Sequence, residues 1–394
     1  MLALDKYLMS SYQSVWKAMI FHERAERFAT IKCAYVNDRV DASVIKHWIE
    51  KLALERIEVK IRRYEERMRE LLDQQRLTVR EPVRRYNAIP FGLNPDELPS
   101  PATRYSQRDF APSHLWEQVL YEGIMEALGY SKNQQQFLRI AKNLPLSFLN
   151  GLVNSNMSPE DERLPLEAAL FGVAGLLPFM KELSDKESKS RVRQLRLYWK
   201  QIRRIYSHEL LNKGEWQFFR LRPENFPTVR LAGAAQIIRK LLRENYVTSI
   251  IQTLKKTERT CVETYRDLER LLIVPADKFW SVHYRFGRRA SSTVTTLIGE
   301  SRANDIIINT IIPIALLYAR IFKNKEVREK AIALLRCPSP EAHNSVIRTM
   351  EEQLIKDKFK IDSGILSQGT IHLHTSYCTP ERCGECAIGK ILFG

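Results

Sequence analysis

The cysteines nearest the C-terminus have a spacing that suits a metal centre. In the segment "YCTPERCGEC" they are Cys378, Cys383 and Cys386, separated by four and then by two residues. Thiolates at this spacing can turn onto a common centre and hold Zn²⁺ or an iron–sulfur cluster. A closed site needs a fourth ligand, which the spacing leaves open. The candidates for it are His372, His374, Cys33, Cys261 and Cys337.

The alternative is that these thiols bind nothing, and the expected compartment bears on that choice. The start "MLALDKYLMSSYQ" does not read as a signal peptide, because Asp5 and Lys6 fall where its apolar core should be. The sequence therefore predicts a cytoplasmic protein, in which thiols stay reduced. Clustered cysteines in such a protein indicate a metal more than a disulfide.

Positive charge is the second feature with chemical meaning. Lysine and arginine number 62 against 46 acidic residues, a formal charge of +16. This excess favours polyanions: nucleic acid first, then an anionic membrane surface, then an acidic protein. The plain alternative is a solvated surface with a basic bias.

Basic residues concentrate in the segment 189–206, which the pattern predicts to be a helix. Tyr198 and Trp199 lie among its cations, and the cations fall near common stripes of a helix. Such a face fits a nucleic-acid backbone, although a solvated face would have the same composition. The residues that we assign to nucleic-acid binding here are Arg193, Arg196, Lys200, Arg203 and Arg204.

A second basic segment, "FFRLRPENFPTVRLA", places three arginines around one asparagine next to a helix start at Pro227. Free amide groups at a helix N-terminus attract an anion, and guanidinium groups can bind phosphate with two hydrogen bonds. A structural turn, with the arginines bonded to nearby glutamates or carbonyls, is an equal alternative. The candidate phosphate-binding residues are Arg220, Arg222, Asn225 and Arg230.

No other segment predicts catalysis. The sequence has no Gly-rich phosphate loop, no G-x-S-x-G and no H-E-x-x-H motif, and paired carboxylates of the kind that a hydrolase uses do not stand out. His283 in "FWSVHYRFG" stands alone among aromatic residues, so we expect it in or near the core. No catalytic residue is therefore assigned.

Helices must position these residues, because helical periodicity dominates the chain. From Leu54 a heptad seam continues through Ile57, Ile61, Tyr64, Met68 and Leu71 and predicts a long amphipathic helix, which could pack on the body or pair with a partner. The segment "LPLEAALFGVAGLL" has almost no polar face and should be central to the core. "SDKE" at 184–187 has the pattern of a capping box that opens the basic helix.

The apolar run "IIINTIIPIALLYA", from Ile306 to Ala319, is interrupted by Pro313 and is too short to span a bilayer. It predicts a buried helix and no membrane partner. The one stretch with a strand-like pattern, "GTIHLHT", is too short to found a sheet.

The predicted fold class is all-α, a multi-helix array with a C-terminal cysteine-ligated metal knuckle. Residues 1–79 form N-terminal helices, residues 80–112 a proline-rich loop or linker, and residues 113–394 the main helical domain with the cysteine motif at 378–386.

Several co-linear motifs resemble a known family. They are "LEAALFGVAGLLP", "RLRPENFPTVRLA", "FWSVHYRF", "IIINTIIPIALLYA" and "YCTPERCGECAIG". Together they resemble a bacterial group, domain of unknown function family 2851, from about Ile31 to the C-terminus. The family brings no established activity. Its motif of a cysteine ahead of "W-x-x-x-L-x-x-E-R" matches Cys33 before Trp48, so the resemblance implies Cys33 as the fourth ligand of Cys378, Cys383 and Cys386.

Fuller members of that family continue upstream with a half similar to a PD-(D/E)xK nuclease core, which this chain lacks. The resemblance therefore implies a split gene product, a fragment or a different start, with a possible partner chain that supplies the nuclease-like half. One early and three late cysteines are similar to the iron–sulfur staple of some recombination and CRISPR-associated exonucleases, so an iron–sulfur cluster is expected, with zinc as the alternative.

The sequence thus predicts a metal-stapled nucleic-acid-binding module, the non-catalytic half of a nuclease-like system. Two alternatives stay open. One is an enzyme that holds a phosphorylated small substrate among the arginines of 220–230. The other is a structural interaction protein that uses the heptad helix.

Overall fold

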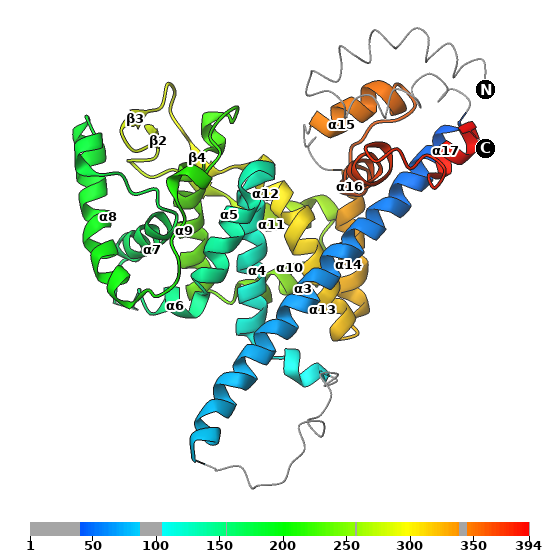
Figure 1. Cartoon of the computed structure of the whole chain (residues 1–394). Helices are drawn as coiled ribbons and strands as arrows, with labels where there is room; N and C mark the ends of the chain where they lie inside the picture. Colours follow the sequence, from blue (N-terminus) through cyan, green and yellow to red (C-terminus); the bar gives the residue numbers. More distant parts are fainter. Residues whose placement is uncertain (1–39, 87–104, 155, 257, 339–344, 394) are drawn as a thin grey trace. The chain divides into compact units, whose positions relative to one another are not determined.

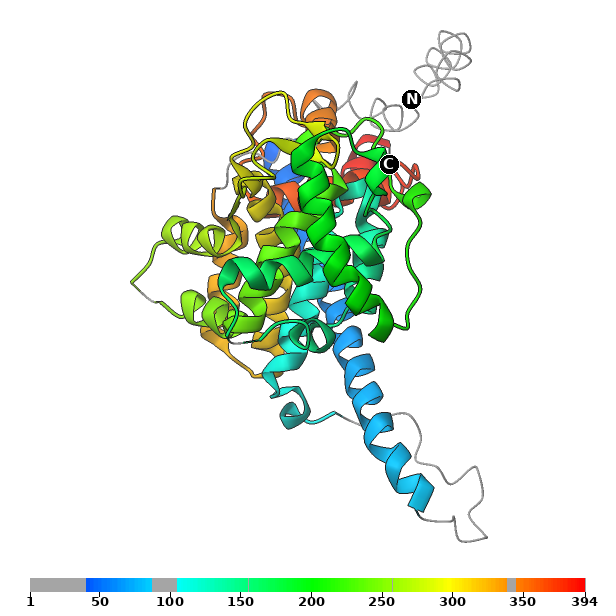
Figure 2. The ribbon, with the colours of Figure 1, turned by 90° about the vertical axis from the view of Figure 1, so that its left-hand side faces the viewer.

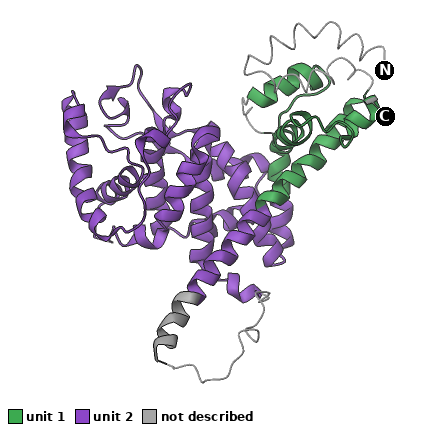
Figure 3. Cartoon of the chain, in the orientation of Figure 1, with its two compact units in different colours: residues 1–60, 332–394 green, residues 61–331 purple. Residues whose placement is uncertain are grey.

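The computed structural model describes residues 40–86, 105–154, 156–256, 258–338 and 345–393, and these are mostly helical (Figure 1). The chain divides into two compact units, one of Met1–Lys60 with Ile332–Gly394 and one of Ile61–Ala331 (Figure 3). The prediction of a helical fold is confirmed. The prediction of an all-α fold is wrong in one detail, because the second unit also contains four very short strands.

The long helix α3 (Ala42–Tyr86) contributes residues to both units. Ile57, Ile61, Tyr64 and Met68 of the predicted seam are buried. Leu54 is 46% exposed, because the buried face of this turn consists of Leu52 and Ala53 instead. The seam therefore packs within the protein's own units, and the predicted amphipathic helix is confirmed.

The loop predicted for residues 80–112 is wrong at its start, since α3 continues past Pro82 to Tyr86. A proline removes one hydrogen bond from a helix and strains it, but it does not always end it. Residues 87–104 lie outside the described residues. A short 3₁₀ helix (Gln107–Phe110) follows them, and Trp116 Nε1 donates a hydrogen bond to the carbonyl of Phe110 (2.7 Å).

The first unit contains the start of α3 and the C-terminal helices. These are α15 (Ser345–Met350), a π-helical turn (Glu351–Ile355), α16 (Gly364–Leu373), a second π-helical turn (His374–Cys378) and α17 (Ala387–Phe393). The "GTIHLHT" stretch with a strand-like pattern lies in α16 and the turn after it, and it is helical. Gly369 lies where α16 meets α3. A Cβ at this position would overlap the carbonyl oxygen of Ile49, so the absence of a side chain lets α16 pack directly on the backbone of α3.

The second unit is built from many packed helices, of which α7 is one of the most deeply buried. The helices are α4 (Ser113–Leu128), α5 (Tyr130–Asn143), α6 (Leu146–Asn150), α7 (Pro159–Val173), α8 (Lys186–Ile205), α9 (Pro227–Arg243), α10 (Tyr246–Leu254), α11 (Cys261–Leu272), α12 (Glu300–Ile306), α13 (Ile312–Ile321) and most of α14 (Lys325–Arg336). Three 3₁₀ turns lie between them, at Met180–Glu182, Lys213–Glu215 and Pro223–Asn225. As predicted, α7 is central: Leu166, Leu170 and Phe171 are fully buried, and α7 packs against α8 and α9 (Figure 2).

The strands lie between α11 and α12. β1 (Val274–Pro275) pairs antiparallel with β4 (Thr296–Ile298), and β2 (His283–Arg285) pairs antiparallel with β3 (Arg288–Arg289). Strands of two or three residues are too short to show an alternating pattern, which is why the sequence does not reveal them. Gly287, with φ 76°, makes the tight turn between β2 and β3.

The predicted buried helix at Ile306 to Ala319 is confirmed as part of one continuous helical segment. α12, a π-helical turn (Ile307–Ile311) and α13 follow each other without a break. Among the described residues this segment, Glu300–Ile321, is the helix long and apolar enough to cross a membrane, but 67% of its apolar window is buried inside the protein. Such burial is typical of a core helix.

Candidate functional site

The outer face of α8 carries most of the predicted basic residues. Arg193, Lys200, Arg203 and Arg204 are exposed, and Leu197 and Ile205 are exposed beside them. Arg203 also donates a hydrogen bond to the carbonyl of Tyr206 (2.8 Å), so it caps the end of its own helix. The amphipathic pattern thus turns these cations outward while Val192, Leu195 and Ile202 face the core.

Arg196 differs from the other cations of this helix. It is half-buried, and its guanidinium donates to the carbonyls of Pro178 (2.8 Å) and Leu177 (3.4 Å). The same group lies over the ring of Phe179, 5.1 Å from its centre. Arg196 therefore makes its contacts within the protein, where it holds the segment before α8 in place.

The β2–β3 hairpin adds cations that the sequence analysis missed. Arg285 and Arg288 are register partners across the hairpin, and Arg289 pairs with Glu187 in the first turn of α8 (2.8 Å). Partial burial, and then the charge of Arg288, lower the pKa of Arg285. In the sequence, the density of basic residues in "HYRFGRR" is the one feature that could have indicated these cations. The hairpin contacts the first turn of α8 through Arg289, and we call the exposed cations of α8 with Arg285 and Arg288 the basic surface.

The arginine turn at 220–230 separates into two parts. Arg220 and Arg222 are exposed. Arg230 is only 6% exposed, and it donates to the carbonyl of Leu297 and to Asn225 Oδ1, each at 2.6 Å. Burial lowers the pKa of Arg230 to about 10. The structure therefore brings Arg230 and Asn225 together as a brace between the turn and β4, and leaves the other two arginines at the surface.

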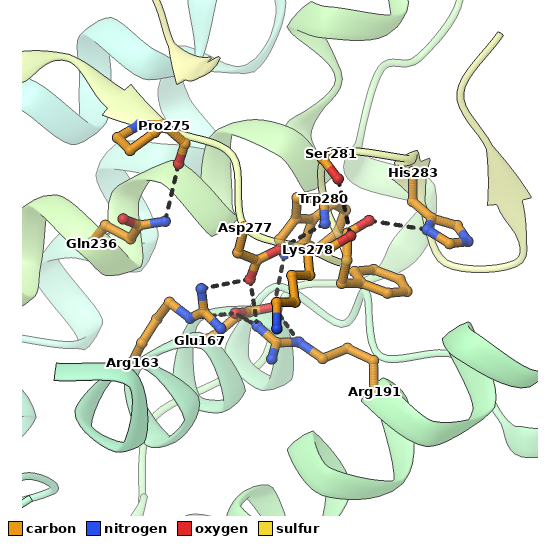
Figure 4. Close-up of polar contacts among 11 residues, drawn as sticks. Arg163, Glu167, Arg191, Gln236, Pro275, Asp277, Lys278, Trp280, Ser281 and His283 are labelled. Carbon is orange, nitrogen blue, oxygen red and sulfur yellow. Dashed lines mark hydrogen bonds and ion pairs between the residues drawn. The ribbon is translucent and has the colours of Figure 1, made fainter. Parts of the chain in front are cut away.

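Beneath the basic surface lies a buried ion-pair network, which we call the matched cluster: Arg163, Glu167, Arg191, Asp277 and Trp280 (Figure 4). Glu167 is fully buried, pairs with Arg191, and accepts a hydrogen bond from Trp280 Nε1 (3.1 Å). Asp277 pairs with Arg163 (2.5 Å) and Arg191 (3.4 Å). Burial raises the pKa of Glu167, and the charge of Arg191 opposes that rise. Two cations thus balance two anions.

A second group lies at the start of α8, and we call it the histidine–carboxylate group: Asp185, Glu187 and His283. His283 Nε2 is 3.5 Å from Asp185 Oδ1 and 3.8 Å from Glu187 Oε2. Asp185, and not Ser184, is the N-cap of α8, since its side chain accepts a hydrogen bond from the amide of Ser188 (2.6 Å). The predicted capping box is therefore wrong, because the helix has its N-cap one residue later than Ser184.

His283 is fully buried, as predicted for a core histidine. Its ring stacks on Phe279, with centres 4.3 Å apart and planes 8° apart. Its Nδ1 lies 3.0 Å from the carbonyl oxygen of Phe279. A carbonyl can only accept, so Nδ1 carries a hydrogen, and Nε2 is the ring nitrogen that faces the two carboxylates. Nε2 is buried without a hydrogen-bond partner among the described residues.

The C-terminal cysteines lie on a compact turn of the first unit. Cys378 and Cys386 are buried and Cys383 is half-buried. The amide of Cys386 donates to the carbonyl of Cys383 (3.2 Å). Among the described residues the donor group gathered within 4.8 Å is the histidine–carboxylate group, and the three thiols do not form such a group. Cys33 lies outside the described residues.

Comparison with known proteins identifies one family. The model of a family described as "Protein of unknown function (DUF2851)" matches residues 106–344. This stretch is more than half of the chain, and it contains the basic surface, the matched cluster and the histidine–carboxylate group. No curated protein and no solved structure matches the chain.

Proposed function

Since the chain belongs to the DUF2851 family, whose description assigns no function, we propose one from its surface. The proposal is that the chain is a nucleic-acid-binding module and that the basic surface is its contact face. The observation that supports it most is the placing of Arg285 and Arg288 opposite each other beside a helix with an exposed row of cations.

Like charges on directly opposed strand residues destabilise a hairpin. A protein that keeps such a pair, in a chain of charge +16, gains from it when an anion lies between the two guanidinium groups. A phosphate backbone supplies such anions in series, and releasing its counterions adds to the binding free energy.

The length of the basic surface favours a polymer over a small molecule. The 20 residues of α8 extend over roughly 30 Å at about 1.5 Å per residue, and its exposed cations run from Arg193 to Arg204. A phosphorylated small substrate would need a concave site with converging donors. Arg230, the arginine best placed to line such a site, is buried and bound to the protein's own oxygens.

The cysteine centre is a second part of this proposal. Cys33, Cys378, Cys383 and Cys386 would hold one structural iron–sulfur cluster, with zinc as the alternative. The choice of the cluster rests on the arrangement of one early and three late cysteines, which resembles the iron–sulfur staple of some exonucleases.

We further propose that the chain does not cut nucleic acid by itself and that a partner chain supplies the nuclease-like half. In this arrangement the chain, in the cytoplasm, would position the nucleic acid for that partner. Labelled DNA incubated with the purified chain and Mg²⁺ should stay intact. Cleavage that persists through repurification would contradict this part of the proposal.

The binding proposal is tested by the salt dependence of affinity for a labelled duplex. Lys200→Ala with Arg204→Ala should reduce the slope of log K against log salt by about 0.9 for each phosphate that the variant no longer neutralises. Lys325→Ala with Arg328→Ala is the matched control, since both residues are exposed on α14 and the change in net charge is the same. Equal effects of the two pairs, or no effect of either, would place the binding face elsewhere.

Anaerobic purification tests the cysteine centre. A brown protein containing iron and sulfide, with the colour absent in Cys383→Ser, supports the cluster, and a colourless protein with one zinc supports zinc. A chain that holds neither metal contradicts the centre, and it leaves the test of the basic surface unaffected.

A further inference from the structure

We propose that Asp185, Glu187 and His283 form a binding site for a divalent metal ion of the manganese or zinc type. The three residues come from two elements of the second unit, the start of α8 and strand β2. Nearly one hundred residues separate the carboxylates from the histidine in the sequence, so only folding brings them together.

The spacing of the donor atoms is close to what a metal requires. All three donors lie within 4.8 Å of one another, with His283 Nε2 at 3.5 Å and 3.8 Å from the two carboxylates. Ligands around a tetrahedral ion with bonds of about 2.0–2.1 Å lie about 3.3 Å apart. Small side-chain rotations of Asp185 and Glu187 would therefore complete the geometry.

His283 has the arrangement of a metal ligand. Ligating histidines commonly donate their second ring nitrogen to a carbonyl or carboxylate, which fixes the tautomer and the ring. Here Nδ1 contacts the carbonyl of Phe279, and the stacked ring of Phe279 holds the plane. Nε2 then faces the carboxylates, buried and without a hydrogen-bond partner among the described residues, where it can bind a metal.

A salt bridge explains these distances less well than a metal does. A protonated histidine donates to a carboxylate at about 2.7–2.9 Å. The separation of 3.5 Å between Nε2 and Asp185 Oδ1 is longer than that, and Asp185 Oδ2 is buried without a partner among the described residues. Arg289 pairs with the outer carboxylate, Glu187, whereas the inner carboxylate of Asp185 has no arginine or lysine partner among the described residues and a cation could balance it.

The ligand set indicates the class of ion. One imidazole and two carboxylates suit Mn²⁺ and Zn²⁺, whereas soft thiolate sites prefer zinc, copper or iron–sulfur clusters. Three protein ligands leave at least one position for water or for an oxygen of an anionic ligand. The ion would also tie β2 and its hairpin to the start of α8.

The test is a titration of the full chain, freed of metal by chelation, with Mn²⁺ followed by electron paramagnetic resonance. Mn²⁺ is the probe because it avoids cysteine sites. We expect one bound ion per chain and a higher Tm in its presence. Asp185→Asn and Glu187→Gln should each weaken binding about tenfold or more. Asparagine caps a helix as well as aspartate does, so the first variant keeps its helix start.

Glu209→Gln is the matched control, since Glu209 is an exposed carboxylate of the same unit and should bind Mn²⁺ like the wild type. Folding of each variant is checked by circular dichroism. Absence of a bound ion in the wild type overturns the proposal. Binding that survives both ligand variants also overturns it, because the ion would then occupy another site.

Discussion

The matched cluster and the histidine–carboxylate group are neighbours in the chain and differ in how their carboxylates are paired. The segment from Asp277 to His283 contributes to both: Asp277 to the first and His283 to the second (Figure 4). In the matched cluster Arg163 and Arg191 balance two carboxylates at ion-pair distances. In the other group Glu187 pairs with the exposed Arg289, and Asp185 pairs with no arginine or lysine among the described residues. Asp185 Oδ2 and His283 Nε2 are buried there without a hydrogen-bond partner among the described residues.

The difference separates a structural site from a site for a ligand. Buried charges need partners, and a cluster that supplies all of them internally has no use for an ion from solution. A buried carboxylate without a paired arginine or lysine, such as Asp185, can instead be stabilised by a bound cation. The following predictions test this distinction, from the largest expected effect to the smallest.

Removing one charge from the matched cluster should be strongly destabilising. Glu167→Gln leaves Arg191 buried beside a neutral amide, and breaking a buried pair in this way costs about 3–5 kcal/mol. Urea denaturation followed by circular dichroism measures the loss. Glu160→Gln, in the exposed first turn of the same helix, should change stability by less than about 0.5 kcal/mol. A loss below about 1 kcal/mol in Glu167→Gln would show that the cluster is not a structural element.

Glu117 is a third buried carboxyl, and it has no paired cation among the described residues, so it shows what an unpaired carboxyl does to stability. Burial raises the pKa of Glu117 to about 7, although the amide of Val247 donates to it (2.9 Å). Between the ordinary pKa of 4.5 and about 7 the folded chain keeps a proton that the unfolded chain releases. This group therefore makes stability fall as pH rises through that window and adds no further change above it.

Glu117→Gln should remove that pH dependence. The variant should match the wild type near pH 4 and exceed its stability at pH 8 by up to roughly 3 kcal/mol, since each pKa unit corresponds to about 1.4 kcal/mol. Urea denaturation at the two pH values measures the difference. If wild type and variant keep the same stability difference at both values, Glu117 titrates normally and its burial carries no charge penalty.

Substitutions in the histidine–carboxylate group should change the stability of the metal-free protein least. Asp185→Asn keeps the N-cap and removes one of two neighbouring negative charges, so stability should change by about 0.5 kcal/mol or less. Asp185→Ala loses the cap and should cost about 1 kcal/mol. Thermal unfolding in chelator compares the two variants. A loss in Asp185→Asn as large as that in Glu167→Gln would mean that both groups are internally balanced, and the proposed contrast would fail.

The sequence predicted those features that depend on local periodicity. The nearly all-apolar segment from Leu164 to Leu177 includes most of α7, the basic amphipathic segment is α8, and the aromatic surroundings of His283 indicated its burial. Each of these rests on side chains within one or two helical turns. The shift of the N-cap from Ser184 to Asp185 shows the limit of such patterns, because neighbouring residues can both cap a helix.

Local sequence determined that this protein is mostly helical and strongly basic and that α7 is buried in a core. It did not determine which charges meet. The sequence made both α8 and the segment 220–230 candidates for binding an anion. The tertiary structure put most of the α8 cations at the surface, left Arg220 and Arg222 exposed, and buried Arg230 against Leu297. It also brought Asp185 and Glu187 to His283, and Glu167 to Arg191 and Trp280. Charges far apart in a chain interact only where packing of the core brings their elements together, and no local pattern encodes that arrangement.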